Sequence, residues 1–136
     1  MDSRIIELSQ YRFQRAQEDF ETAEANLKDG RLKASLNRSY YAIFHALRAV
    51  TILSGFDSSK HSGIISYFNR NYVKMGLFEG EISELIKNAS RMREKSDYQD
   101  FFIVAREDTD SQLKDAKYIL NKIESYLNSE WEKTHS

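Results

Sequence analysis

The sequence predicts an all-α fold, an antiparallel up-and-down bundle of four long helices plus a shorter one. Apolar residues recur at three- and four-residue steps over most of the chain, as they do along one face of a helix. No proline interrupts these stretches, and no segment of useful length alternates apolar and polar residues as a half-buried strand does. With 136 residues, the chain is long enough for one domain around one core, residues 1–136, and too short for two.

Glycines mark the ends of the first two predicted helices. Apolar residues keep a regular three- and four-residue spacing from Phe13 to Leu27, and Gly30 follows this segment. The second segment, about residues 31–53, is followed in the same way by Gly55. A glycine just beyond the last periodic residue is typical of a helix C-cap, so each helix is expected to end close to its glycine.

Two more helices are predicted in the middle of the chain. Asp57 and the serines after it are candidate N-caps for a third helix that ends at Gly76. Apolar residues at helical spacing predict a fourth helix over about residues 79–96.

Residues 97–104 are expected to form a loop before the last helix. Within it, Tyr98 is predicted to close the end of the bundle, and the apolar run 101–104 to form a buried turn or a strand-like arm. One apolar stripe then continues for about five turns, from Leu113 to Trp131, and predicts a final helix packed along the length of the bundle.

Composition excludes several classes of function. A net charge of −1 provides no overall positive field for nucleic acid or an anionic membrane, so any such contact must be local. The absence of cysteine excludes disulfides, thiolate catalysis and cysteine-based zinc sites. The three histidines lack the spacing of a zinc site, and neither a metal nor another cofactor is predicted. Because the sequence has no hydrophobic signal core and no apolar stretch of membrane-spanning length, a cytoplasmic protein without a membrane partner is expected.

The second predicted helix carries a cation and an imidazole on one face. Seven residues at 100° each bring His45 back to within about 20° of Arg38. The apolar stripe of this helix lies roughly opposite, and the positions around the pair include Ala42 and Ala49, whose small size lets another backbone approach. We therefore expect this face to lie against a second helix or a second copy of the chain. A symmetric pairing would bring two Arg38 and two His45 together in a homodimer.

Three separate patches of the sequence resemble one family. They are residues 37–47, N-R-S-Y-Y-A-I-F-H-A-L, residues 60–63, K-H-S-G, and residues 93–98, R-E-K-S-D-Y. In this order, within an all-α chain of domain length, they resemble the HEPN domain proteins of prokaryotes over nearly the whole chain. The resemblance implies a helical bundle that usually dimerises. It also implies a partner, because members are often encoded beside a minimal nucleotidyltransferase with which they form a toxin–antitoxin pair.

The same resemblance implies an activity. Catalytically active members share an Arg followed by a polar residue, and a His separated from that Arg by four to six residues, and they act as metal-independent endoribonucleases. Here Arg38 and Ser39 are followed by His45, and six residues separate Arg38 from His45, at the upper limit of the pattern. Members whose tyrosine is adenylylated carry it two residues past the His. Leu47 occupies that position here, which puts this modification in doubt.

Arg38 and His45 are the candidate catalytic residues because of the chemistry of RNA cleavage. Without a metal, the reaction needs two proton transfers, which suit an imidazole, and a stabilised phosphate, which suits a guanidinium. Ser39 is a candidate to orient either group, and Tyr41 a candidate to stack on a base. One protomer supplies one His45, so two of them across a dyad would supply base and acid.

Other polar residues are weaker candidates. Arg91, Arg93 and Lys95 are possible phosphate contacts beside the Arg38 site, although such a charge run is usually a solvated helix face. His61 is expected to begin the third helix and to pack against a neighbouring loop, and His135 lies in the tail.

The sequence leaves three functions open. The first is an endoribonuclease toxin that uses Arg38 and His45 to cleave RNA. The second is a non-catalytic HEPN module that binds a nucleotide, or docks a nucleotidyltransferase partner, through the same groove. In the third, the two residues make only interface hydrogen bonds in a structural dimer.

Overall fold

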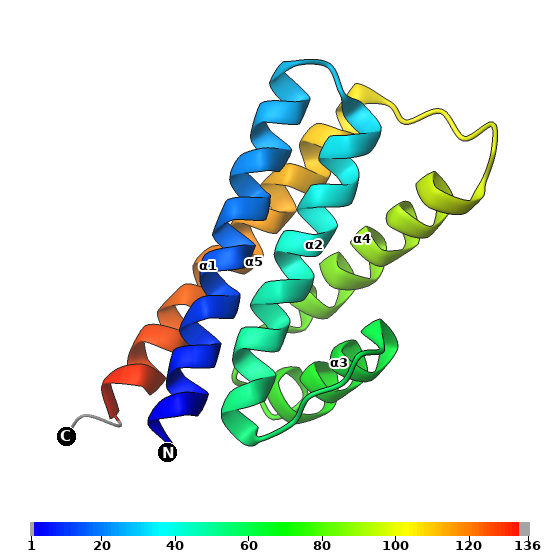
Figure 1. The fold of residues 1–136 in the computed structure, drawn as a ribbon. Helices are drawn as coiled ribbons and strands as arrows, with labels where there is room; N and C mark the ends of the chain where they lie inside the picture. The colour runs from blue at the N-terminus through cyan, green and yellow to red at the C-terminus, as the bar shows by residue number, and fades with distance from the viewer. Residues whose placement is uncertain (1, 134–136) are drawn as a thin grey trace.

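A computed structural model describes residues 2–133, and within that range the chain is helical with no strand. Four long helices and one short helix follow one another, which confirms the predicted fold class (Figure 1). A 3-10 turn, η1, extends the second helix over Ile52–Ser54, and a π-helical turn, η2, extends the third over Asn69–Val73. The α-helices are α1 (Ser3–Lys28), α2 (Leu32–Thr51), α3 (His61–Phe68), α4 (Gly80–Tyr98) and α5 (Arg106–Lys133).

The helix limits follow from local chemistry. The side chain of Asp2 accepts a hydrogen bond from the backbone N–H of Arg4 and caps the start of α1. Beyond the ends of α1 and of α2 with η1, Gly30 and Gly55 have φ values of 78° and 79°. These left-handed conformations favour glycine, so both glycines end helices as the sequence predicts.

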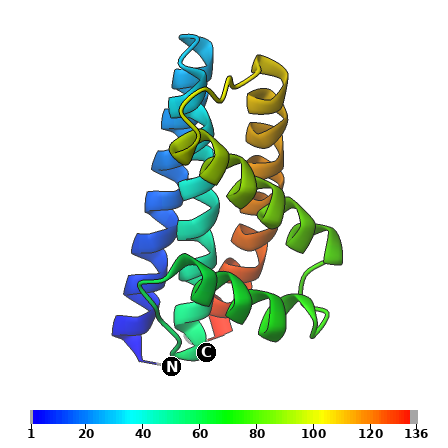
Figure 2. The same ribbon diagram turned by 90° about the vertical axis from the view of Figure 1, so that its right-hand side faces the viewer.

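Two layers of helices surround the core. Helices α1, α2 and α5 run side by side, and α4 crosses them obliquely while α3 lies across one end (Figures 1 and 2). Helix α2 is central, since it packs against each of the other four α-helices. Full burial of each large apolar side chain stabilises the fold by roughly 1.5–3 kcal/mol. The largest fully buried apolar side chains include Leu36, Ile43 and Leu47 from α2, Ile64 and Phe68 from α3, Ile82 and Ile86 from α4, and Ile119, Ile123 and Leu127 from α5.

Helix α1 of the same chain covers the small-residue face of α2. The hydroxyl of Ser9 donates a hydrogen bond to the carbonyl of Ala49, and the hydroxyl of Ser35 donates one to the carbonyl of Ala23. Ala42 and Ala49 are fully buried. The sequence left open whether another helix of the same chain or a second copy of the chain covers this face. In this fold α1 covers it, so no second copy can pack directly on Ala42 and Ala49.

The connection between α4 and α5 differs from its prediction. Tyr98 is 75% exposed, and within the run 101–104 Phe101 is 96% and Ile103 88% exposed, while Val104 is buried. The prediction that Tyr98 closes the bundle and that this run is buried or strand-like was therefore wrong. Figure 1 shows the reason, because the end of α4 diverges from the bundle and the connection projects beyond it.

Within residues 2–133, none of the helices combines the length and the apolar character needed to cross a membrane.

Candidate functional site

Arg38 and His45 of α2 meet a common partner on α1. The Arg38 guanidinium donates a hydrogen bond of 3.3 Å from Nη1 to Oδ1 of Asp19. Nε2 of His45 lies 3.5 Å from the other oxygen of the same carboxylate, Oδ2. Helical geometry thus places the two α2 residues on one face as expected, and the packing of α1 brings an acidic group between them.

This arrangement satisfies Arg38 but leaves one oxygen of Asp19 without a hydrogen-bond donor. Arg38 also donates to the side-chain carbonyl of Asn37, from Nε at 3.2 Å and from Nη2 at 2.8 Å, and its side chain is 37% exposed. The Oδ2 atom of Asp19 is buried and accepts no hydrogen bond from residues 2–133. A buried carboxylate oxygen without a donor is costly, so the site favours a ligand or proton that satisfies it.

His45 is held as a neutral imidazole. Burial, together with the nearby charges of Arg15, Arg48 and Arg38, lowers its pKa from 6.5 to about 4, against the opposing effect of Asp19. Near neutral pH the ring is therefore unprotonated and has a lone pair free to accept a proton, but a pKa of about 4 makes it a weaker base than an ordinary histidine.

Tyr41 joins the Arg38 site to α4. The guanidinium carbon of Arg38 lies 4.9 Å from the centre of the Tyr41 ring, and that of Arg93 lies 5.8 Å from it. Arg93 also donates a hydrogen bond of 3.3 Å from Nη1 to the Tyr41 hydroxyl. Contacts of a guanidinium with an aromatic ring are favourable by roughly 0.5–2 kcal/mol. Two cations from different helices therefore meet at one aromatic side chain.

Ser39 does not lie with Arg38 and His45. Its side chain is buried; the hydroxyl donates to the carbonyl of Leu36 at 2.9 Å and accepts from Nε2 of Gln112 on α5 at 2.7 Å. Ser39 is one residue, or about 100°, further round α2 than Arg38, which turns it toward α5. The hypothesis that Ser39 orients either candidate catalytic group does not fit this position.

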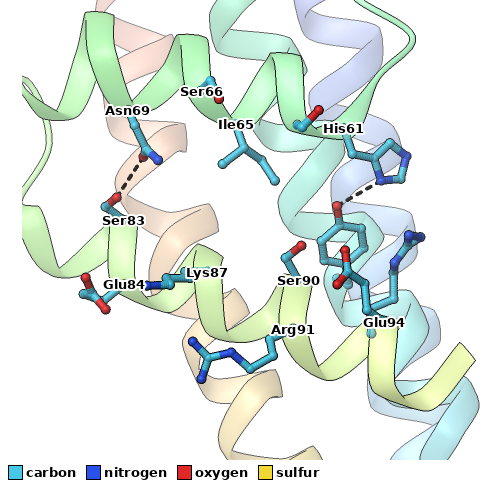
Figure 3. A pocket seen from close by; sticks show the side chains of 13 residues that line it. His61, Ile65, Ser66, Asn69, Ser83, Glu84, Lys87, Ser90, Arg91 and Glu94 are labelled. Carbon is cyan, nitrogen blue, oxygen red and sulfur yellow. Dashed lines mark hydrogen bonds between the residues drawn. The ribbon is translucent and has the colours of Figure 1, made fainter. Parts of the chain in front are cut away.

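The basic residues of α4 divide between two surroundings. Arg91 and Arg93 both line a cleft of about 440 Å³ between α4 and the α3–η2 segment (Figure 3). Arg91 is exposed there, whereas Arg93 is half-buried against Tyr40 and Tyr41. Lys95 is exposed and does not line this cleft. The cleft is walled by polar side chains, including Ser62, Ser66 and Asn69 on one side and Ser83, Glu84, Lys87, Ser90, Arg93 and Glu94 on the other.

His61 joins the site in a way that the sequence prediction missed. It begins α3, as expected, but its ring packs 4.1 Å from Phe44 and 5.6 Å from Tyr41, both measured between ring centres. Its Nδ1 lies 3.0 Å from the Tyr40 hydroxyl, within hydrogen-bonding distance. The sequence feature that could have indicated this position of His61 is the patch K-H-S-G, residues 60–63.

Asp19 was missed as well. Asp19 lies between Ala16 and Ala23 on the buried side of α1. An acidic residue on the apolar side of a predicted helix is the sequence signal that could have identified Asp19 as part of the site. His135 lies outside the described residues. Residues 2–133 bring together no group of three histidine, aspartate or glutamate side chains able to hold a metal ion.

Comparisons with known proteins agree on one family. The HEPN domain profile matches residues 9–126. A UPF0332 protein of Thermotoga maritima is 32% identical over 91% of this chain and 92% of its own length. A UPF0332 protein of Archaeoglobus fulgidus is 29% identical over 86% of this chain and 93% of its own length. A Methanocaldococcus jannaschii protein named "Putative toxin" is 25% identical over 84% of this chain and 78% of its own length.

Proposed function

Because the chain belongs to the HEPN domain family, we propose that it is a toxin that cleaves RNA without a metal ion, using Arg38 and His45. The observation that carries this proposal is the shared site of these two residues, at which a guanidinium and a neutral imidazole face the same carboxylate. The relative named as a toxin supports the class of function.

The chemistry assigns a role to each residue. His45 takes the proton of the ribose 2′-hydroxyl, and the 2′-oxygen attacks the phosphorus. Arg38 donates hydrogen bonds to the phosphate oxygens, whose negative charge grows in the transition state. The bond from phosphorus to the 5′-oxygen breaks, and the leaving oxygen takes up a proton. The products are a 2′,3′-cyclic phosphate and a 5′-hydroxyl end.

The surroundings of Arg38 suit a single strand of RNA. Tyr41 is half-buried beside two guanidinium groups, and its ring is the aromatic surface proposed for stacking with a base. Beyond it, Arg93 and the cleft with Arg91 offer local positive charge in a chain whose net charge is −1. Lys95, exposed on the same helix, is a further proposed phosphate contact.

We propose that the protein acts in the cytoplasm as a homodimer, restrained by a minimal nucleotidyltransferase as its antitoxin. The exposed apolar side chains of Tyr98, Phe101 and Ile103 are available for association. Since α1 covers the small-residue face of α2, any dimer seam must use other surfaces than Ala42 and Ala49.

A second candidate function is a non-catalytic module that binds a nucleotide or docks the nucleotidyltransferase. One observation favours it: Asp19 already engages Arg38, and a phosphate must displace or outweigh that contact. In this case Arg38 and Tyr41 hold the ligand and no bond is broken.

The deciding experiment is RNA cleavage with EDTA present, comparing wild type with Arg38→Ala and His45→Ala. Arg70→Ala is the matched control, because Arg70 is exposed and does not line the cleft. Loss of the phosphate contact is expected to slow cleavage by about 10²–10³-fold and loss of the imidazole by about 10²–10⁴-fold. The control is expected to cleave like wild type and to leave 2′,3′-cyclic phosphate ends.

Absence of cleavage by the folded wild type, across several RNAs, would overturn the nuclease proposal. Binding of nucleotide or of the nucleotidyltransferase that is lost in Arg38→Ala would then favour the second function. Equal cleavage by wild type and both variants would place the activity elsewhere.

A further inference from the structure

We propose that His61 is the second proton-transfer residue of the site, so that one protomer carries both imidazoles that RNA cleavage needs. The inference rests on the proposed nuclease function and names the group that protonates the leaving oxygen. The competing source of that proton is His45 of a second copy across a dyad.

The first argument is position. His61 of α3 and His45 of α2 both pack on Phe44, with ring centres 4.1 Å and 6.0 Å from it. They also both pack near Tyr41, at 5.6 Å and 6.1 Å. Both imidazoles thus lie beside the same two aromatic side chains of α2, within one protomer.

The second argument is orientation. The contact of Nδ1 with the Tyr40 hydroxyl fixes the His61 ring, and the ring lines the cleft between α3 and α4 (Figure 3). No residue in 2–133 makes a hydrogen bond to Nε2 of His61, and the residue is only half-buried. One nitrogen is therefore anchored, and the other makes no hydrogen bond within the described residues.

The third argument is the placement of positive charge. Arg38 and Arg93 both contact the Tyr41 ring, and Arg93 also lies 5.0 Å from the ring of Tyr40, which holds His61. A phosphate bound at Tyr41 between the two guanidinium groups has His45 and His61 as its neighbouring imidazoles. Each end of the reacting phosphodiester then has its own proton-transfer group.

The two histidines have different surroundings. His61 faces Tyr40, Tyr41 and Arg48 from α2 and Arg93 from α4, and Glu94 of α4 shares its cleft. Burial, then Arg93 and Arg48, lowers the pKa of His61. A bound phosphate adds negative charge beside these cations, which raises that pKa and favours the protonated ring that an acid requires.

The groups that face His45 are Asp19 and Arg15 from α1 and Arg38, Tyr41 and Arg48 from α2. We therefore assign the more buried His45 as base and the more accessible His61 as acid. Protonated His61 gives its proton to the 5′-oxygen as the phosphorus–oxygen bond breaks. The proton that His45 has accepted returns through solvent after the products leave.

The experiment measures cleavage of ordinary RNA by His61→Ala and His61→Gln, with Arg70→Ala, at an exposed residue outside the cleft, as the control. Cleavage is expected to fall by about 10²-fold or more in both His61 variants and to stay at the wild-type rate in the control. The limb of the pH–rate profile that reports the acid is expected to disappear. Circular dichroism checks that all variants are folded, and binding measurements check that they still bind RNA.

A modified substrate separates a proton donor from a residue that only supports the fold. In RNA with sulfur in place of the 5′-bridging oxygen, the leaving thiolate needs no proton. His61→Ala is expected to cleave this substrate at close to the wild-type rate, whereas His45→Ala is expected to remain slow. A purely structural role of His61 predicts no such rescue.

Two further results would overturn the inference, and they have different consequences for the nuclease proposal. If wild type and His61→Ala cleave ordinary RNA equally, with the same pH profile, the acid is another group and the nuclease proposal stands. If wild type cleaves neither substrate, the nuclease proposal and this inference fail together.

Discussion

The Oδ2 atom of Asp19 on α1 lies 3.5 Å from Nε2 of His45, the candidate base on α2. Its other oxygen accepts a hydrogen bond from Arg38. One carboxylate therefore contacts both candidate residues, and the site exists only where α1 and α2 are packed together.

Asp19→Asn is expected to lower the pKa of His45 below about 4, because the carboxylate is the group that raises it against burial and the neighbouring arginines. The measurement is an NMR titration of the imidazole protons. Glu18→Gln, on an exposed position of the same helix, is the control and is expected to leave the titration unchanged. A rise in the His45 pKa in Asp19→Asn would contradict the described geometry.

Wild type is expected to lose more stability than His45→Gln as the pH falls. The pKa of His45 is about 4 in the folded protein, whereas an imidazole in an unfolded chain has the ordinary pKa of 6.5, so between these values the unfolded chain binds more protons. The free energy of unfolding then decreases from about pH 6.5 to about pH 4, by up to about 3 kcal/mol. Urea unfolding of both proteins at several pH values measures the difference, and parallel curves would rule out the buried neutral imidazole.

Asp57→Asn is expected to lower the free energy of unfolding by about 1–2 kcal/mol, because it leaves the charge of Arg12 buried without its partner. Arg12 donates to both oxygens of Asp57, at 3.3 Å and 2.8 Å, and its side chain is 10% exposed. The matched control is Asp110→Asn, since Asp110 pairs with Lys114 on the surface and its loss is expected to cost about 0.5 kcal/mol or less. Equal effects of the two substitutions in urea unfolding would contradict this prediction.

Ser39→Ala is expected to lower the free energy of unfolding by about 1 kcal/mol through the lost hydrogen bonds, and to leave the rate of RNA cleavage unchanged. Its hydroxyl is buried between the Leu36 carbonyl and Gln112, away from Arg38. Thermal unfolding and the cleavage assay measure the two effects. A large loss of cleavage with unchanged stability would restore Ser39 as a residue of the site.

Ala49→Leu is expected to destabilise the single chain by about 1–3 kcal/mol, because the extra side-chain volume must be accommodated between α1 and α2. Ala49 is fully buried, and Ser9 of α1 donates a hydrogen bond to its carbonyl. Urea unfolding combined with light scattering tests this. Loss of association with unchanged stability would instead place Ala49 in a contact between copies.

Much of the fold could be predicted from sequence because helix formation and helix ends depend on nearby residues. The positions of Gly30 and Gly55 predicted where α1 and α2 end, and both glycines have the positive φ that such an end requires. The loop before α5 was predicted less well. The exposure of Phe101 depends on how far the end of α4 diverges from its neighbours, which no local pattern records.

For the candidate site, the sequence by itself determined that Arg38 and His45 share one face of α2, since a spacing of seven residues fixes this in any α-helix. Only the tertiary structure decided what meets that face. Asp19 reaches it from α1, and His61 approaches the adjoining aromatic side chains from α3. These contacts join residues distant in sequence, and they depend on how whole helices pack against one another rather than on the periodicity within one helix.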